Sequence, residues 1–445
     1  MSKLCVANID IEVGSENGLP EPEKANEAIT AITILLNGTY HVFGCGYYEQ
    51  HRDDVVYNKC ADEFELVDKF LDLWTQYYPD AITGWNVNFF DIPYLMNRIK
   101  RLFGDEKIAK FSPWGKVNAR EVEFKSKKET VYEIMGVAML DYYEMYRKFS
   151  SNPNQESYKL DYIANVELGE KKLDYSQYGN LHQLYKNNYQ KFIEYNVRDV
   201  ELVHKLEDKI RLIELVCTLA YYAKVNLDDV FSQVRMWDTI TYNILKKKHI
   251  AVQPKKSARK DAQYAGAFVK DPILGMHNWV ASFDLNSLYP HLIMMYNLSP
   301  ETLLEPDMLN ADLRTFFKDN GSNINVDSLL RQEIDTSVLK PNKVALTPNG
   351  QMFSIEKQGF LPEIMETMYE DRAMYKSKAI EARKRKEKAV SEQEKNELDK
   401  QIARFNNIQL AMKVTLNSAY GAIGNEFFRF FDIRQATAVT TSGQL

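Results

Sequence analysis

The stretch NIDIEV, residues 8–13, places the carboxylates of Asp10 and Glu12 on one face of a predicted β-strand. The apolar side chains between and after them point to the opposite face. Two neighbouring carboxylates repel each other, and inside a sheet a divalent metal ion is the usual counter-charge. An exposed edge strand with a solvated polar face explains the same pattern without a metal. This stretch alone therefore leaves both interpretations open.

Strand and helix patterns alternate around this stretch. Residues 4–13, 29–36 and 81–85 have strand-like patterns, whereas residues 63–78 have the apolar spacing of a helix. This alternation predicts an α/β domain. Residues 189–215 contain neither Gly nor Pro and are predicted to form one long helix that closes the domain.

The composition indicates a soluble multidomain protein. The chain has 445 residues, enough for about three domains. Its composition, with 45% hydrophobic and 27% charged residues, excludes wholesale disorder. With 56 basic and 62 acidic residues the net charge is −6, so a polyanion partner must be held by local basic patches. The four cysteines lack a C-x-x-C pair, which excludes a zinc ribbon. Neither a signal peptide nor an apolar run of about 18 residues is present, so we expect a cytoplasmic protein.

The second half is predicted to contain another α/β unit, which begins near residue 256 after a polar linker. A strand is expected around Asp284, within WVASFDL. Residues 363–420 contain neither Gly nor Pro, and one helix of that length would extend about 87 Å at ~1.5 Å per residue. We therefore predict an antiparallel helical hairpin whose second helix starts with a capping box of Ser391 and Glu394.

Further candidate residues lie on or beside predicted helices of the first half. Asp91 follows WNVNFF and precedes an amphipathic helix, so capping that helix is its simplest role. Tyr195 and Asp199 are spaced i, i+4 on the predicted long helix, which places a phenol and a carboxylate on one face. A solvated helix face explains that spacing equally well when it is considered alone.

Taken together and in this order, NIDIEV, NVNFFD and YNVRD resemble the motifs of the proofreading 3′→5′ exonuclease domain of DNA polymerases. The resemblance implies a ribonuclease-H-like fold in which carboxylates hold two magnesium ions and Tyr195 orients the attacking water. The metal ligands that it implies are Asp10, Glu12, Asp91 and Asp199. Two metal ions can activate such a water and stabilise the leaving oxygen of a phosphodiester.

The segment SFDLNSLYPHLI, residues 282–293, resembles motif A of family B DNA polymerases, and the NLSPET that follows matches the T-even phage replicative type. The resemblance implies that Asp284 is a metal-binding catalytic carboxylate and that the Leu285 carbonyl is a second metal contact. The residues implied to line the incoming nucleotide are Leu285, Ser287, Leu288 and Tyr289. The Tyr289 ring would lie beneath the sugar and exclude a 2′-hydroxyl. Without the motif, a strand-end cap and a core aromatic explain Asp284 and Tyr289.

The segment KVTLNSAYGAIGN, residues 413–425, resembles motif B of the same family. The nucleotide-binding residues that it implies, with their partners on the first hairpin helix, are Arg372, Lys376, Lys413, Asn417, Tyr420 and Gly421. Lys413, Asn417 and Tyr420 share one helix face, and Gly421 is expected to end the helix. The cations of both helices would converge on one triphosphate. A solvated charged hairpin is the alternative.

Between the two halves, AQYAGAFVKDP, residues 262–272, resembles the Y-x-G-G/A segment that contacts DNA in this family. The resemblance implies that Tyr264 packs on a sugar and that Gly266 lets the backbone approach a phosphate. A surface turn before a strand is the alternative.

The motif Y-x-D-T-D, which supplies the second polymerase carboxylate in this family, does not occur in the sequence. We therefore expect an α/β multidomain portion of a polymerase: exonuclease, partial palm and fingers. The expected division is 1–211 for the exonuclease domain, 212–255 for a helical linker region, 256–358 for the first part of the palm, 359–425 for the fingers hairpin and 426–445 for an incomplete return to the palm.

The resemblance implies a DNA-directed DNA polymerase with proofreading, active on primer-template DNA and deoxynucleoside triphosphates with two Mg²⁺ per site. A second chain, or a missing carboxyl-terminal part, would complete the polymerase site and would carry any contact with a sliding clamp. The expected location is the cytoplasm, that of the host cell if the gene is a phage gene. The alternatives are a free-standing 3′→5′ DNA exonuclease and a DNA-binding scaffold subunit without its own chemistry.

Overall fold

The computed structural model describes residues 4–14, 18, 20–124, 127–150, 154–255, 266 and 269–445. The chain divides into two compact units, Met1–Glu214 and Leu215–Leu445, and each is described by itself. Strands with flanking helices in the first unit and helices with a small sheet in the second confirm the α/β multidomain class. No helix in the described ranges has the length and apolar character needed to cross a membrane.

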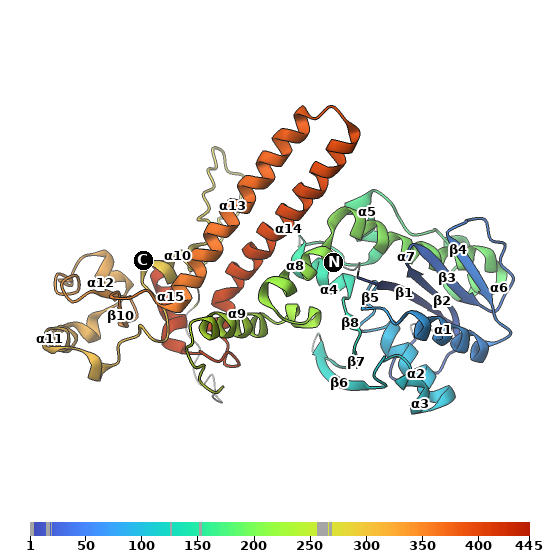
Figure 1. The fold of residues 1–445 in the computed structure, drawn as a ribbon, viewed down its shortest axis with the longest axis horizontal. Helices are drawn as coiled ribbons and strands as arrows, with labels where there is room; N and C mark the ends of the chain where they lie inside the picture. The colour runs from blue at the N-terminus through green and yellow to red at the C-terminus, as the bar shows by residue number, and fades with distance from the viewer. Residues whose placement is uncertain are drawn as a thin grey trace. The chain divides into compact units, whose positions relative to one another are not determined.

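A mixed six-stranded sheet forms the centre of the first unit (Figure 1). Its strands, in spatial order, are β4 (Val55–Lys59), β3 (Thr39–Gly44), β2 (Ile29–Leu36), β1 (Val6–Val13), β5 (Ala81–Thr83) and β8 (Ala138–Met139). The neighbours β1, β2 and β3 run antiparallel, whereas β4, β5 and β8 pair in parallel. Since β1 lies between β2 and β5, the edge-strand interpretation of Asp10 and Glu12 is wrong.

Helices cover both faces of this sheet. Ile9 and Ile11 of β1 belong to the core under α1 (Glu63–Tyr77) and α2 (Asp91–Phe103). The opposite face packs on α7 (Tyr189–Ile210). Because side chains alternate along a strand, Asp10 and Glu12 face α7. The sheet thus presents its two carboxylates to the helix that carries Tyr195 and Asp199.

The remaining elements of the first unit surround this sheet and its helices. They are the hairpin β6 (Val117–Phe124) and β7 (Lys127–Ile134), the helices α3 (Asp105–Ala109), α4 (Tyr142–Phe149), α5 (Leu160–Leu168) and α6 (Leu181–Asn187), and the 3₁₀ turn η1 (Ser176–Tyr178).

The predicted helix over residues 189–215 is wrong as one element, because α7 ends at Ile210. Arg211 has a left-handed backbone, with φ 59°. Its amide donates to the Glu207 carbonyl (2.8 Å), and the Ile213 amide donates to the Glu207 carboxylate (3.1 Å). A new helix, α8 (Leu212–Ala223), then begins. The Glu207 side chain accepts the Ile213 amide, which has no helical partner at the break. The helix can therefore break here without a Gly or a Pro in the sequence.

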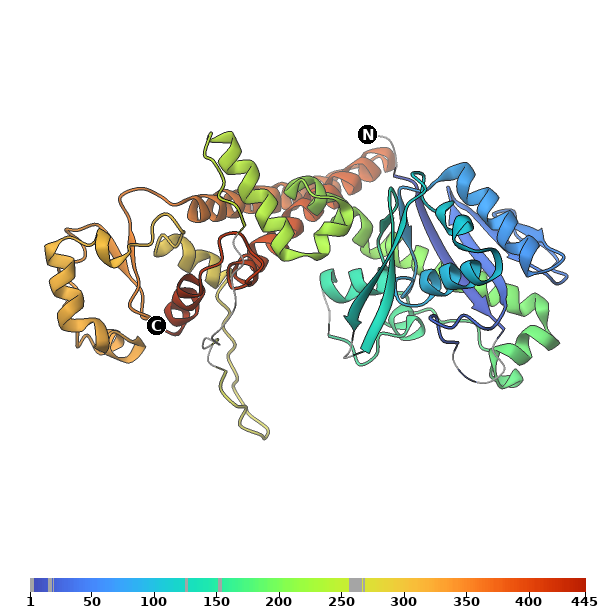
Figure 2. The ribbon, with the colours of Figure 1, turned by 90° about the horizontal axis from the view of Figure 1, so that it is seen from below.

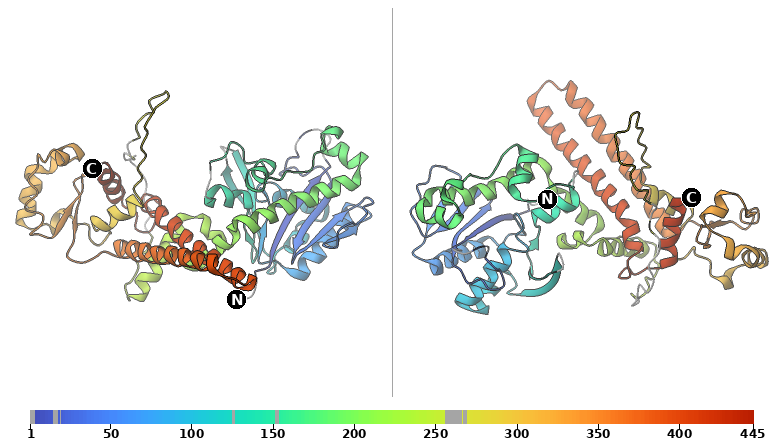
Figure 3. Two further views of the ribbon diagram at one scale, coloured as in Figure 1. Left: turned by 90° about the horizontal axis from the view of Figure 1, so that it is seen from above. Right: turned by 180° about the vertical axis from the view of Figure 1, so that it is seen from behind.

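The second unit is built on two long helices, α13 (Phe360–Lys388) and α14 (Glu392–Ile423), which lie side by side in both views of Figure 3. The Ser391 hydroxyl accepts the Glu394 amide (3.2 Å) and starts α14 as predicted, but the return bond from the Glu394 side chain that would complete the capping box is not formed. Gly421 does not end this helix, contrary to the prediction. A Cβ at Gly421 would lie 2.5 Å from Gln233 Oε1, so glycine serves close packing there.

Shorter elements surround these two helices. They are η2 (Leu227–Phe231), α9 (Gln233–Lys247), α10 (Leu288–Met295), η3 (Pro306–Met308), α11 (Ala311–Asn320), η4 (Gly321–Asn323), α12 (Val326–Leu330), β9 (Val344–Leu346), β10 (Met352–Ser354) and α15 (Ile433–Gln444). The strands β9 and β10 pair antiparallel and pack with α11 in a core of their own.

The strand predicted around Asp284 is not formed. Residues 279–285 lack regular structure and are exposed, and the yellow segment that contains them extends away from the helices in Figure 2. Trp279, Phe283 and Leu285 are among its exposed large side chains. A strand needs a neighbour for its backbone groups, and no strand of the described ranges pairs with this segment.

Candidate active site

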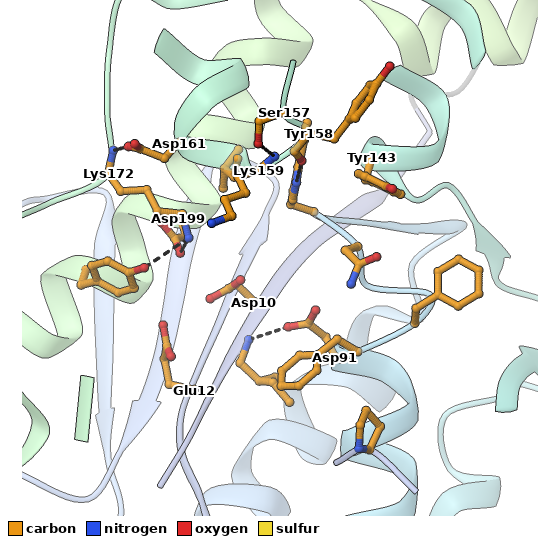
Figure 4. Close-up of a pocket in the computed structure, with 18 of the residues that line it drawn as sticks. Asp10, Glu12, Asp91, Tyr143, Ser157, Tyr158, Lys159, Asp161, Lys172 and Asp199 are labelled. Atoms are coloured by element: carbon orange, nitrogen blue, oxygen red, sulfur yellow. Dashed lines mark hydrogen bonds and ion pairs between the residues drawn. The ribbon is translucent and has the colours of Figure 1, made fainter. Parts of the chain in front are cut away.

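The carboxylates of Asp10, Glu12 and Asp199 meet where β1 faces α7. One carboxylate oxygen from each lies within 4.8 Å of those from the other two. Figure 4 shows them converging at one end of a cavity of about 920 Å³. In the part of the chain that the structure describes, this is the one such group of three or more acidic, His or Cys side chains.

Asp91 lines the same cavity but is not a member of that close group. It is the first residue of α2, and Phe90 precedes it without a side-chain cap. Its Oδ1 accepts the Ile11 amide (3.0 Å), so the carboxylate is tied to β1 between the two acidic positions. The role as a simple helix cap is therefore wrong for Asp91.

Asn196 fixes the carboxylate of Asp10. Its side-chain amide donates to Asp10 Oδ2 (2.6 Å), and its Oδ1 accepts the Thr33 hydroxyl. The side chain is completely buried. Sequence reasoning missed this residue, although it follows Tyr195 directly within the YNVRD motif.

Lys172 supplies the positive charge of the cluster, and sequence reasoning missed it as well. Its Nζ contacts Asp199 Oδ2 (2.5 Å) and donates to the Tyr195 hydroxyl (3.2 Å). Burial alone would lower its pKa, but Asp199, the Tyr195 hydroxyl and Asp10 around it hold the pKa above its ordinary value. The residue lies in the polar stretch GEKKLDY, where no periodicity distinguishes it from Lys171.

Burial and mutual repulsion raise the pKa values of the acidic residues. Burial, together with the charge of Asp199, raises the pKa of Glu12 to about 8, and burial raises the pKa of Asp91 to about 7. Burial and the other three carboxylates also raise the pKa of Asp10. In the described ranges the cavity lining holds two ammonium groups, those of Lys172 and Lys159, against the four carboxylates, which leaves a deficit of positive charge.

The donor set fits divalent metal ions. Oxygen ligands and excess negative charge are what Mg²⁺ and similar hard cations require. Asp199 Oδ1 is buried and has no hydrogen-bond partner among the described residues. Asp10, Glu12 and Asp199 would hold such an ion, with Asp91 at the same cavity.

The rest of the cavity is lined mainly by aromatic and polar side chains. The loop that follows β5 contributes Trp85 and Asn86, and Tyr158 and Lys159 approach from the segment before α5. The buried Asp141 carboxylate holds this loop, because it accepts the amides of Asn86 (3.0 Å) and Asn88 (2.9 Å). The Trp85 ring donates to the Tyr158 carbonyl (3.1 Å). Aromatic faces and hydrogen-bonding groups thus extend away from the carboxylates.

The predicted polymerase residues are brought together only in part. Asp284 and Leu285 lie in the exposed segment, and Asp284 belongs to no group of three or more acidic, His or Cys side chains in the described ranges. Ser287 precedes α10 with a left-handed backbone (φ 53°), and Leu288 and Tyr289 begin that helix. These residues therefore lie partly in the irregular segment and partly at the start of α10.

Two aromatic side chains predicted at the nucleotide site are in contact. The ring centroids of Tyr289 and Tyr420 are 4.7 Å apart, which joins α10 to α14. The predicted cations lie on the paired helices, Arg372 and Lys376 on α13 and Lys413 on α14 with Asn417 one turn further. Arg372 Nε is buried and has no partner among the described residues.

The structure describes only part of the predicted DNA-contacting segment, residues 262–272. Tyr264 lies outside the described residues. Gly266 is exposed, and its carbonyl accepts the side-chain amide of Gln444 (3.0 Å).

Comparison with known proteins identifies the class. The family model described as DNA polymerase family B, exonuclease domain, matches residues 2–163, and the model described as DNA polymerase family B matches residues 229–445. The chain belongs to the family B DNA polymerases, which confirms the resemblance seen in its motifs.

Individual relatives include phage and eukaryotic enzymes. The chain is 33% identical over 509 residues to the DNA-directed DNA polymerase of Escherichia phage RB69, covering 100% of this chain and 54% of that protein. It is 32% identical over 507 residues to the corresponding enzyme of Enterobacteria phage T4, covering 99% and 54%. The DNA polymerase delta catalytic subunit of Mesocricetus auratus is 27% identical over 478 residues. The chain thus spans about half the length of the phage relatives that it matches.

Proposed function

We propose that this chain removes nucleotides from the 3′ end of DNA and carries the first part of a DNA polymerase site. The observation that carries the proposal is the group of Asp10, Glu12 and Asp199 at one end of an aromatic-lined cavity. The order of three antiparallel strands followed by parallel ones supports a ribonuclease-H-like exonuclease domain over residues 1–211.

The nuclease reaction would need metal ions that the protein's own residues hold in place. Bound Mg²⁺ would activate a water molecule and stabilise the oxygen that leaves the phosphodiester. Tyr195 accepts a hydrogen bond from Lys172, so its own proton is directed elsewhere and can be donated to a water or phosphate oxygen. Asn196 keeps Asp10 turned toward Asp199 and Glu12.

The remaining cavity suits the end of a single strand. Aromatic faces such as those of Trp85 and Tyr158 stack on any base, so binding of this kind is independent of sequence. The side chain of Lys159 adds positive charge beside the carboxylates. A duplex end would have to unpair before its terminal nucleotide could enter.

The polymerase assignment rests on motif A, motif B and the relatives. Asp284, with the Leu285 carbonyl, would hold one part of a metal site, and Ser287, Leu288, Tyr289 and Gly421 would line the incoming nucleotide. Arg372, Lys376, Lys413 and Asn417 would bind its phosphates, and Tyr420 packs on Tyr289 in support of a shared site. The primer-template would pass Tyr264 and Gly266. After the linker, residues 212–255, the first part of the palm would comprise residues 256–358. The fingers would comprise residues 359–425, and the return to the palm would comprise residues 426–445.

A second polypeptide segment is part of this proposal. One carboxylate cannot fix two metal ions, so a further acidic residue must be placed against Asp284. The exposed apolar side chains of Trp279, Phe283 and Leu285 support such a docking segment. That segment would carry any contact with a sliding clamp.

The nuclease proposal is tested with one single-stranded oligonucleotide labelled at either end. In Mg²⁺ the purified chain should shorten the 5′-labelled strand progressively and release the 3′ label first as a mononucleotide. Chelation of the metal should stop both reactions. Cleavage within the strand, or release from the 5′ end, would contradict the proposal. DNA binding without any cleavage would favour the scaffold alternative instead.

A further inference from the structure

The position of Lys172 depends on a segment without regular structure. Residues 170–172 follow α5 and the left-handed Gly169, and they belong to no helix or strand. Lysine has a long flexible side chain, so the backbone at this position must be fixed if Nζ is to remain on Asp199. Two neighbouring helices provide that fixation.

Arg198 on α7 binds residues 170–172 from one side. It precedes Asp199 in the sequence, yet its guanidinium group binds residues 170–172 rather than the carboxylate cluster. Nε and Nη2 both donate to the Lys171 carbonyl (3.3 Å each), and Nη2 also contacts Glu170 Oε2 (2.6 Å). Nη1 is held by Glu201 on the next turn (2.5 Å), so the planar group is oriented before it meets the segment.

Asp161 on α5 holds the segment from the other side. Its Oδ1 accepts the backbone amide of Lys172 itself (2.8 Å). The carbonyl of Lys171 and the amide of Lys172 are the two polar groups of one peptide bond. Arg198 and Asp161 therefore fix that single peptide plane from both of its edges.

We propose that Arg198 and Asp161 are positioning residues for the nuclease reaction, which act by holding the peptide between Lys171 and Lys172 so that Nζ stays on Asp199 and Tyr195. This inference rests on the proposed nuclease function. Asp161 also lines the cavity and Arg198 does not, but the role proposed for both passes through the backbone of Lys172. A purely structural role in the ion pairs on the surface of α7 is the competing explanation, and it makes different predictions.

The first test separates rate from binding. Arg198→Met and Asp161→Ala should each lower kcat for single-stranded DNA by about 10- to 100-fold, with little change in KM, because a displacement near 1 Å is costly to a reacting group. Asp161→Asn keeps an oxygen acceptor and should recover most of the rate. Lys205→Met is the matched control: Lys205 pairs with the Glu170 carboxylate (2.8 Å) and touches neither polar group of the peptide.

The second test asks whether both changes act through the same lysine. In a Lys172→Met background, Arg198→Met should reduce kcat no further, because its effect passes through Lys172. Effects that multiply in the double variant would overturn the inference and favour the structural explanation.

The third test does not depend on nuclease activity. An amine-reactive ester should acylate Lys172 several-fold faster in Arg198→Met than in the wild type, relative to the exposed Lys384 in the same sample, as measured by peptide mass spectrometry. Faster acylation in a chain that degrades no DNA would refute the proposed function while supporting the fixation of Lys172. Unchanged acylation together with unchanged kcat would overturn the inference.

Discussion

At the scale of single residues, the position of the Asp10 carboxylate depends on its hydrogen bond with Asn196. Replacing it with Ala leaves Asp10 Oδ2 and the Thr33 hydroxyl without their present partners in a buried site. We expect Asn196→Ala to lower the free energy of unfolding by about 1–3 kcal/mol. Urea denaturation measures this, and the exposed Asn187→Ala on α6 serves as the control, with a change within about 0.5 kcal/mol. Equal effects of both substitutions would contradict the buried role of Asn196.

The raised pKa values of the acidic cluster predict how stability changes with pH. In the folded chain the pKa of Glu12 is about 8 and that of Asp91 about 7, against ordinary values of 4.5 and 3.8. Without metal the folded chain therefore keeps protons that the unfolded chain releases. This contribution to stability is fully present below the ordinary values and is lost as the pH rises through about 8.

Urea unfolding in EDTA measures this loss. The difference in unfolding free energy between the wild type and the neutral double variant Asp10→Asn, Glu12→Gln should move in favour of the variant between about pH 5 and pH 8. Mg²⁺ should reduce the trend, because it neutralises the carboxylates in the folded state. A difference that moves in favour of the wild type as the pH rises would contradict the arrangement of buried carboxylates.

At the scale of elements, the end of β5 is packed directly against β1. A Cβ at Gly84 would overlap the carbonyl oxygen of Ile9, the residue before Asp10. Gly84→Ala should therefore cost about 1–3 kcal/mol in unfolding free energy and displace the acidic face of β1. Gly38→Ala is the control, since a Cβ there meets nothing within 4 Å and only the backbone (φ +85°) is strained, at about 1 kcal/mol. Similar nuclease rates for both variants would contradict this coupling.

Elements with a regular pattern could be predicted from the sequence, and those that depend on a partner could not. Alternation identified β1, a short β-like apolar run identified β2, and the hydroxyl of Ser391 correctly marked the start of α14. The break at Arg211 depends on the Glu207 side chain, which accepts a backbone amide. The spacing of apolar residues along the sequence does not indicate such a bond. The segment around Asp284 has the composition of a strand, but pairing requires a neighbour that no described element supplies.

The candidate site shows the same division. Asp10, Glu12 and Asp199 could be predicted because NIDIEV and YNVRD resemble exonuclease motifs, whereas their spacing on a strand and a helix alone also fits solvated faces. Lys172 could not, because it reaches Asp199 from an irregular segment 27 residues away in the sequence. Its role emerges only when α5 and α7 are packed together.

At the scale of the whole molecule, the two proposed activities should separate. Nucleotide addition by this chain alone should be undetectable or very slow, because the motif Y-x-D-T-D, which would supply the second carboxylate, does not occur in the sequence. A polypeptide that carries the remaining palm strand and thumb should restore templated synthesis. Asp284→Asn should then abolish synthesis and leave the nuclease rate unchanged, since the nuclease carboxylates lie in the other unit. Efficient synthesis by the purified chain, lost with Asp284→Asn, would contradict the need for a second segment.

The central claim is that buried carboxylates form a metal-dependent nuclease site, and the single-turnover rate of 3′ nucleotide removal in Mg²⁺ tests it most directly. The double variant Asp10→Ala, Glu12→Ala should lower this rate by about a thousand-fold or more, because both side chains are proposed metal ligands. The exposed Asp72→Asn on α1 should leave the rate unchanged. Retention of the wild-type rate by the double variant would contradict the claim.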